Sequence, residues 1–125
     1  MTSYHFIAFL FAFSLLTFFW TGCYYDNEEE LYPFEPCETA NMSFATNIMP
    51  IFNQNCNVCH ATSQALGNVI LDTHAEVKKQ VDAGRLLGAI RHENTFFPMP
   101  QGQPQLSSCT IEKIASWVAA GAPNN

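Results

Sequence analysis

The clearest chemical signal in this chain is the pentapeptide Cys56-Asn57-Val58-Cys59-His60. Two thiols three positions apart, followed at once by an imidazole, match the attachment pattern of c-type haem. Each thiol can form a thioether with one vinyl group of haem, and the histidine then lies beneath the iron as its proximal ligand. We therefore expect Cys56 and Cys59 to hold one haem c covalently and His60 to ligate its iron.

A candidate for the opposite axial position lies later in the chain, in Phe97-Pro98-Met99-Pro100. Each proline pushes the residue before it, Phe97 or Met99, toward extended geometry. A stiff, extended segment suits a loop that presents one sulfur over a buried ring. We expect Met99 to be the distal iron ligand.

Other side chains compete with Met99 for this role. Met49 lies close in sequence to the haem-binding motif, and His74 or His92 would give a bis-histidine centre. The choice matters because methionine–histidine ligation raises the reduction potential of the iron, whereas two histidines should leave it lower.

The Cys-x-x-Cys pair has two other readings. It could be half of a zinc site, but structural zinc usually takes four protein ligands. No second Cys-x-x-Cys or spaced His pair exists among the remaining candidates, which are His5, His74, His92, Cys37 and Cys109. It could also be a thioredoxin-type dithiol, but that motif lies beside a strand in an α/β unit.

The size of the chain favours a bound prosthetic group. Its 125 residues allow one small domain with appendages, and small domains bury little apolar surface alone. A covalent haem would supply a large apolar centre for helices to wrap. The expected lining residues are Ile51, Phe52, Leu71, Leu86, Leu87, Ile90, Trp117 and Val118.

The first 22 residues differ from the rest. An apolar block from Phe6 to Trp20 holds six of the eleven phenylalanines and is followed by Thr21-Gly22-Cys23. This arrangement resembles a bacterial secretory signal that ends at a lipoprotein processing site. The resemblance implies removal of residues 1–22, lipidation of Cys23, and an exported, membrane-anchored protein facing the periplasm or the cell exterior. Ordinary cleavage nearby and an uncleaved anchor are the alternatives.

The acidity of the chain is confined to its N-terminal part. The formal net charge is −6, and no base precedes residue 41. The acids in this part are Asp26, Glu28, Glu29, Glu30, Glu35 and Glu38. We expect residues 23–42 to form an acidic flexible tether and residues 43–125 to form a nearly neutral domain. We expect no binding to nucleic acid from a chain with this charge distribution.

Two cysteines remain, Cys37 and Cys109. In a chain sent to an oxidising compartment, an even pair favours a disulfide. The bridge would close a loop of about 70 residues and stabilise the fold by roughly 4 kcal/mol on the chain-entropy argument. The alternative is two unrelated small buried side chains.

A first helix is expected to lead into the haem motif. Asn47 can cap it, and Ile48, Ile51 and Phe52 have the spacing of one buried face. Pro50 would then lie in the first turn, where its missing N–H costs little.

Two further helical segments are expected in the middle of the domain. Thr73 and Glu76 have the spacing of a capping box, and Gly84 is suited to end the helix that follows. Residues 85–91 allow another short helical turn.

The last helix has the best-defined signals. Ser107 or Ser108 can cap it, and Gly121 and Pro123 stop it. An amphipathic stripe runs along it, formed by Ile111, Ile114, Ala115 and Val118. No stretch alternates well enough for a sheet, so the sequence predicts an all-α domain.

Together these features resemble a single-domain bacterial class I c-type cytochrome. The likeness rests on Pro50-Ile51-Phe52 leading into the haem motif, on Met99-Pro100, and on Trp117 before Gly121. It implies a small helical fold with its terminal helices packed crosswise against one covalent haem. The implied function is electron transfer between other redox proteins, with no enzymatic activity and with the membrane contacted through the lipid anchor.

Two alternatives stay open at this point. A haem enzyme or gas-binding domain would have an open distal position, with His92 as the nearby acid–base candidate. The chain could also be one subunit of a larger complex that uses the haem as a relay. Arg85 and Arg91 are candidate partners for the haem propionates.

Overall fold

The computed structural model describes residues 36–125, which form one compact unit. The expected signal sequence, the lipidation site at Cys23 and the first part of the tether lie outside the described residues. Within these residues every regular element is a helix and no strand occurs, which confirms the all-α prediction. The elements are η2 (Phe44–Ile48), α3 (Met49–Asn55), α4 (Asn57–His60), η3 (Leu66–Asn68), α5 (His74–Asp82), α6 (Arg85–Ile90) and α7 (Ser108–Ala119).

The first helical segment has its cap four residues before the predicted one. The side chain of Ser43, not that of Asn47, caps it by accepting from the Thr46 amide. The Oδ1 atom of Asn47 reaches back and accepts from the Ser43 amide at 2.9 Å. The two side chains therefore satisfy N–H groups at the same helix start, in the manner of a capping box.

Pro50 explains why this segment opens as a π-helix. Inside a helix, proline lacks an N–H and its ring clashes with the carbonyl four residues earlier. The wider turn of η2 avoids that clash, and the Met49 N–H donates to the Phe44 carbonyl five residues before it. α3 contains the fully buried Phe52 and leads directly into the Cys56–His60 pentapeptide.

The later helices begin and end where the sequence indicated. Thr73 caps α5 by accepting from the Glu76 amide, and Gly84 takes the left-handed conformation between α5 and α6. Ser107 caps α7 through the Thr110 amide at 3.2 Å. The chain leaves α7 through Gly121, which has a positive φ.

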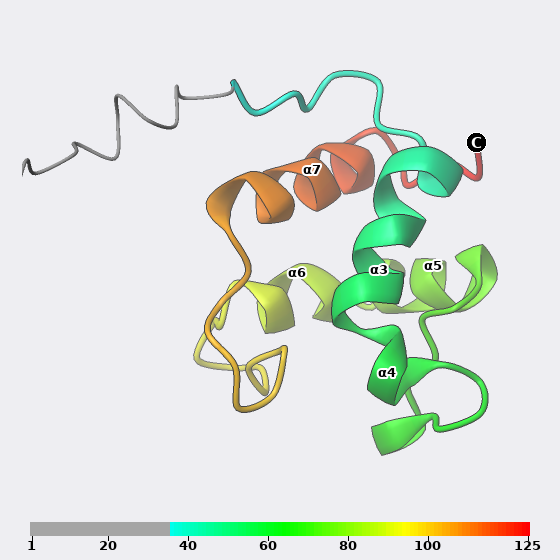
Figure 1. The fold of residues 1–125 in the computed structure, drawn as a ribbon, viewed down its shortest axis with the longest axis vertical. Coiled ribbons are helices and arrows are strands. Elements are labelled where there is room, and N and C mark those ends of the chain that lie inside the picture. The colour runs from blue at the N-terminus through cyan, green and yellow to red at the C-terminus, as the bar shows by residue number, and fades with distance from the viewer. Residues whose placement is uncertain (1–35) are drawn as a thin grey trace, which may run out of the picture. The chain divides into compact units, whose positions relative to one another are not determined.

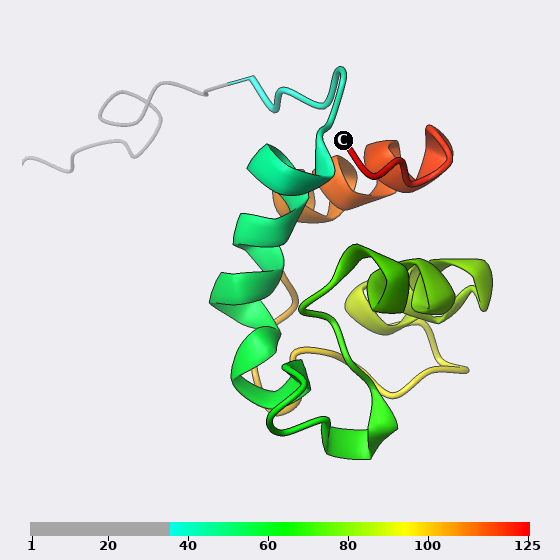
Figure 2. The ribbon, with the colours of Figure 1, turned by 90° about the vertical axis from the view of Figure 1, so that its right-hand side faces the viewer.

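The helices cross one another and do not form an aligned bundle (Figure 1). η2 and α3 form one continuous rod, and α7 packs across its η2 end, while α6 packs between α5 and α7. A view from the side shows α5 and α6 facing α3 and α4 (Figure 2). The core between them is Met42, Phe44, Ile48, Phe52, Leu71, Val77, Leu86, Ile90, Ile114, Trp117 and Ala122.

The residues just before η2 pack against α7. Cys37 forms a disulfide with Cys109 of α7, the same pair that the sequence indicated. The Thr39 carbonyl accepts from the Ser116 hydroxyl at 2.7 Å, and Met42 is buried. The flexible tether expected over residues 23–42 was therefore assigned too far along the chain, because residues 37–42 are held by a covalent bond and by the core.

Removal of this disulfide should destabilise the domain without affecting the haem motif. The bridge spans 72 residues of sequence, so the chain-entropy argument gives a loss of about 4 kcal/mol for Cys37→Ser with Cys109→Ser. Denaturant unfolding of the double variant measures this loss. An unchanged midpoint would show that the bridge does not constrain the unfolded chain.

None of the helices in residues 36–125 is long and apolar enough to cross a membrane.

Candidate functional site

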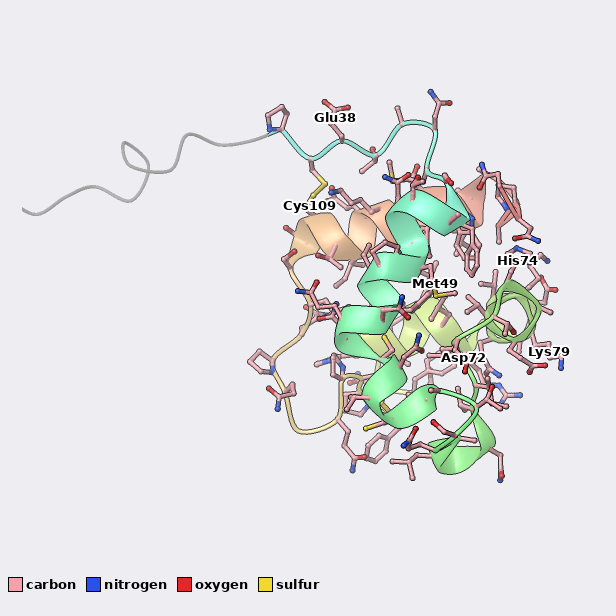
Figure 3. All side chains as sticks on the ribbon, turned by 45° about the vertical axis from the view of Figure 1, so that its right-hand side comes forward. Glu38, Met49, Asp72, His74, Lys79 and Cys109 are labelled. Atoms are coloured by element: carbon pink, nitrogen blue, oxygen red, sulfur yellow. A yellow bond between two sulfur atoms is a disulfide. The ribbon has the colours of Figure 1, made fainter. Side chains whose placement is uncertain are left out.

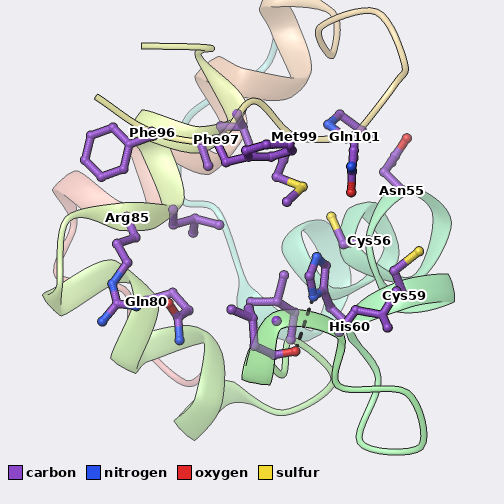
Figure 4. Close-up of a pocket in the computed structure, with 18 of the residues that line it drawn as sticks. Asn55, Cys56, Cys59, His60, Gln80, Arg85, Phe96, Phe97, Met99 and Gln101 are labelled. Carbon is purple, nitrogen blue, oxygen red and sulfur yellow. Dashed lines mark hydrogen bonds between the residues drawn. The ribbon is translucent and has the colours of Figure 1, made fainter. Parts of the chain in front are cut away.

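The junction of α3 and α4 places both thiols and the imidazole on one cavity (Figure 4). The Cys56 N–H closes α3 by donating to the Phe52 carbonyl at 2.8 Å. The Cys56 carbonyl then accepts from the amides of Cys59 and His60, both at 3.0 Å. This tight turn brings three side chains that are close in sequence to the same wall.

The hydrogen bond of His60 fixes which ring nitrogen can bind a metal. Its Nδ1 atom lies 3.2 Å from the Val69 carbonyl, drawn as the dashed line in Figure 4. A carbonyl only accepts, so Nδ1 carries the proton and Nε2 keeps its lone pair. This is the tautomer that a histidine ligand needs, and a carbonyl partner of this kind orients the ring and raises its basicity.

The loop between His60 and α5 supports that carbonyl. The Leu71 N–H donates to the His60 carbonyl at 2.7 Å. Asp72 accepts from the amide of Thr62 at 2.6 Å and from its hydroxyl at 3.0 Å. These hydrogen bonds join the two ends of the loop that contains Val69. Nothing in the sequence indicated this non-local arrangement.

Because Asp72 accepts these hydrogen bonds, the stability of the domain should depend on pH. The amide and then the hydroxyl of Thr62 lower the pKa of Asp72. A depressed carboxyl pKa contributes stability above its unfolded value, and that stability is lost as the pH falls through the folded pKa. Asp72→Asn should therefore destabilise the domain modestly at neutral pH, and the two proteins should converge in acid. Denaturant unfolding at both pH values tests this, and a constant difference between them would contradict it.

Met99 lies on the wall opposite His60. Its sulfur points into the cavity in Figure 4, and its N–H donates to the Ala89 carbonyl of α6 at 3.0 Å. Among the side chains considered for the distal position, Met99 alone lines the cavity.

The competing distal candidates are engaged elsewhere (Figure 3). His74 donates through Nε2 to the Ala122 carbonyl at 2.9 Å and packs edge-on against Phe44, with ring centroids 4.8 Å apart. Met49 packs against the hydrophobic core. The Nε2 atom of His92 lies 3.0 Å from the Met99 carbonyl, so this imidazole contacts the candidate ligand's backbone.

The cavity has a volume of about 560 Å³, within the range of about 300–1,000 Å³ typical of ligand sites. Three of the eight predicted lining residues, Leu71, Leu86 and Ile90, do line it. The prediction was wrong for Phe52 and Trp117, which are fully buried in the core between the helices. Ile51, Leu87 and Val118 also pack on that core. Several other apolar residues line the cavity that were not predicted from the sequence, namely Val58, Leu66, Val69, Ala89, Phe96, Phe97 and Leu106.

The cavity is not apolar throughout. Arg85 and Gln80 line it on the side of α5 and α6, and Gln101 lies near Asn55 on the other side (Figure 4). Arg91, the other predicted propionate partner, does not line the cavity. It is half-exposed, with Nη1 3.9 Å from a carboxylate oxygen of Glu93.

No protein-family model, curated protein or solved structure matches this chain. Its function has to be argued from the residues of the cavity.

Within residues 36–125, no group of three or more His, Cys, Asp or Glu side chains is arranged to hold a metal ion. The state of the thiols bears on the reading of the pair as a dithiol nucleophile. A dithiol nucleophile needs a lowered thiol pKa. Burial instead raises the pKa of the Cys56 thiol to about 11. That thiol is therefore protonated at neutral pH.

Proposed function

We propose that this chain is a monohaem c-type cytochrome that transfers single electrons, with His60 and Met99 as the axial iron ligands. The observation that carries the proposal is the placement of two thiols, a correctly tautomerised imidazole and a thioether on the walls of one mainly apolar cavity. The haem, when bound, would supply an iron that gains or loses one electron.

The residues of the proximal wall have distinct roles in this proposal. The thiols of Cys56 and Cys59 would hold the haem covalently, each adding across one vinyl group so that sulfur bonds to one carbon and the thiol hydrogen goes to the neighbouring carbon. His60 offers the Nε2 lone pair to the metal while the Val69 carbonyl holds its Nδ1 proton.

The distal wall and the cavity end complete the fit. Met99 offers a soft sulfur, which favours the ferrous state and so raises the reduction potential. Arg85 lines the cavity with a guanidinium that matches a carboxylate such as a haem propionate in geometry and charge. With both axial positions taken, the site has no open coordination position for substrate, which supports electron transfer over enzymatic chemistry.

The rim of the cavity supports exchange of electrons with other proteins. Within the described residues, the large apolar side chains exposed to solvent are Val58 (76%), Phe97 (62%) and Leu66 (55%). All three line the cavity. Apolar side chains are therefore exposed around the cavity that would hold the haem, where other redox proteins could approach it.

The N-terminal segment sets the proposed location. With residues 1–22 removed and Cys23 lipidated, an acidic tether would hold the domain at a membrane in the periplasm or at the cell exterior. Such tethering raises the effective concentration of membrane-bound redox partners.

The test is expression of the full chain with haem-attachment machinery in an exporting host. We expect the mass to increase by one haem, the ferric protein to show the weak red absorption band of methionine ligation, and the ferrous protein to bind carbon monoxide poorly. An exported protein without porphyrin would overturn the proposal. Covalent haem with ready carbon monoxide binding and no red band would instead favour a gas-binding or enzymatic site.

A further inference from the structure

We propose that His92 is a positioning residue for Met99, holding the backbone of the distal ligand so that its sulfur stays over the haem. This inference rests on the proposed function and assigns a new role to an imidazole that the sequence offered as a rival ligand and as an acid–base candidate. The bond that carries it runs from Nε2 of His92 to the Met99 carbonyl at 3.0 Å.

The turn after α6 aims this imidazole. The amides of His92 and Glu93 donate to the carbonyls of Ala89 and Gly88 at 3.2 and 3.0 Å, which closes the helix. His92 itself has a φ of +55°, a left-handed conformation that residues with a side chain rarely adopt. The chain reverses there, and the side chain of His92 meets the backbone seven residues further on.

The segment around Met99 has few groups of its own with which to hold its position. Pro98 and Pro100 have no N–H to donate, so the Met99 amide is the one backbone donor between Phe97 and Gln101. That amide donates to the Ala89 carbonyl at 3.0 Å.

The two hydrogen bonds fix Met99 from both sides. Ala89 holds its N–H and His92 holds its C=O, and both partners belong to α6 or to the turn directly after it. α6 also supplies Leu86 and Ile90 to the cavity wall. The backbone of Met99 is therefore held by the same helix that forms part of the cavity wall.

Loss of the imidazole should free the carbonyl side of Met99 while leaving the thioether in place. Methionine ligation would then compete less well with an added ligand. A hydrogen bond of ordinary net strength corresponds to a change of roughly tenfold in such an equilibrium. His92 would act only through Met99 and would not contact the iron.

The experiment compares three variants of the haem-loaded full chain. His92→Gly removes the donor and adopts the left-handed backbone freely, so the substitution introduces no new backbone strain. His92→Gln restores a side-chain N–H donor. His74→Ala is the matched control, because it removes another histidine-to-carbonyl bond of this domain, at Ala122 and away from the cavity.

The readouts are carbon monoxide affinity of the ferrous protein, the red band of the ferric protein, and the reduction potential. We expect His92→Gly to bind carbon monoxide roughly tenfold more tightly, with a weaker red band and a lower potential. His92→Gln should recover part of each change. His74→Ala should lower the unfolding midpoint and leave all three readouts at wild-type values.

Two results would overturn the inference. One is a His92→Gly protein with wild-type readouts, and the other is equal changes in His74→Ala, which would mean that general loosening is the cause. If the wild-type protein itself lacks the red band and binds carbon monoxide freely, methionine ligation fails, and the role of His92 fails with it.

Discussion

The full chain with Cys56→Ser and Cys59→Ser should contain no covalent haem and should lose its stable fold. The reason is the size of the cavity, about 560 Å³ in a domain whose core has only eleven buried side chains. Without haem, the apolar side chains that line this cavity would face water, and the domain would lose the burial on which a small core depends. Whole domains are stable by only about 5–15 kcal/mol, so the haem-free chain should collapse or unfold.

Mass analysis and far-ultraviolet circular dichroism of the exported protein measure these two effects. Each single serine variant keeps one thiol and should retain some attached haem with intermediate stability. The Cys37→Ser, Cys109→Ser protein is the control for haem content, since it loses two disulfide-bonded cysteines outside the cavity and should keep its haem. A fully folded double variant at Cys56 and Cys59 would contradict the idea that the haem completes the core.

Gly88→Ala should destabilise the domain, because among its glycines only Gly88 has side-chain atoms where a methyl group would lie. A Cβ atom at Gly88 would lie 2.2 Å from Cδ2 and 2.3 Å from Cε2 of Phe96, a separation that atoms do not tolerate. The ring must therefore move, and Phe96 is part of the cavity wall. Overpacking typically costs about 1–3 kcal/mol, and here the displaced ring should also change the absorption spectrum of bound haem.

A double-mutant cycle with Phe96→Ala separates this clash from other effects. If the contact with the ring is the cause, Gly88→Ala should cost much less in the Phe96→Ala background than in the wild-type protein. Denaturant unfolding of the four proteins gives the coupling energy. Additive losses would show that the methyl group acts on something other than Phe96.

The sequence predicted best those features that depend on neighbouring residues. Thr73 and Ser107 cap their helices as expected because a cap involves only a few consecutive residues. The Cys37–Cys109 pair followed from counting thiols once the haem motif had been set aside. Met99 was singled out by its flanking prolines, and it does line the cavity.

The features that the sequence missed depend on contacts between distant segments or on backbone carbonyls. Any residue offers a carbonyl, so nothing in the sequence marks Val69 as the partner of His60. The same applies to the bond between His92 and the Met99 carbonyl. Apolar spacing did not separate lining residues from core residues either, because Phe52 has the same spacing but lies in the core between the helices and not on the cavity.

The two walls of the cavity come from different stretches of chain, and this has a consequence for biosynthesis. The wall with both thiols and His60 is complete within residues 55–71, whereas the facing wall comes from residues 80–106. Contacts that are local in sequence form sooner than distant ones because less loop entropy opposes them. If the chain is exported and loaded with haem as proposed, both thiols would emerge before the segment that carries Met99, and the haem would approach from that open side.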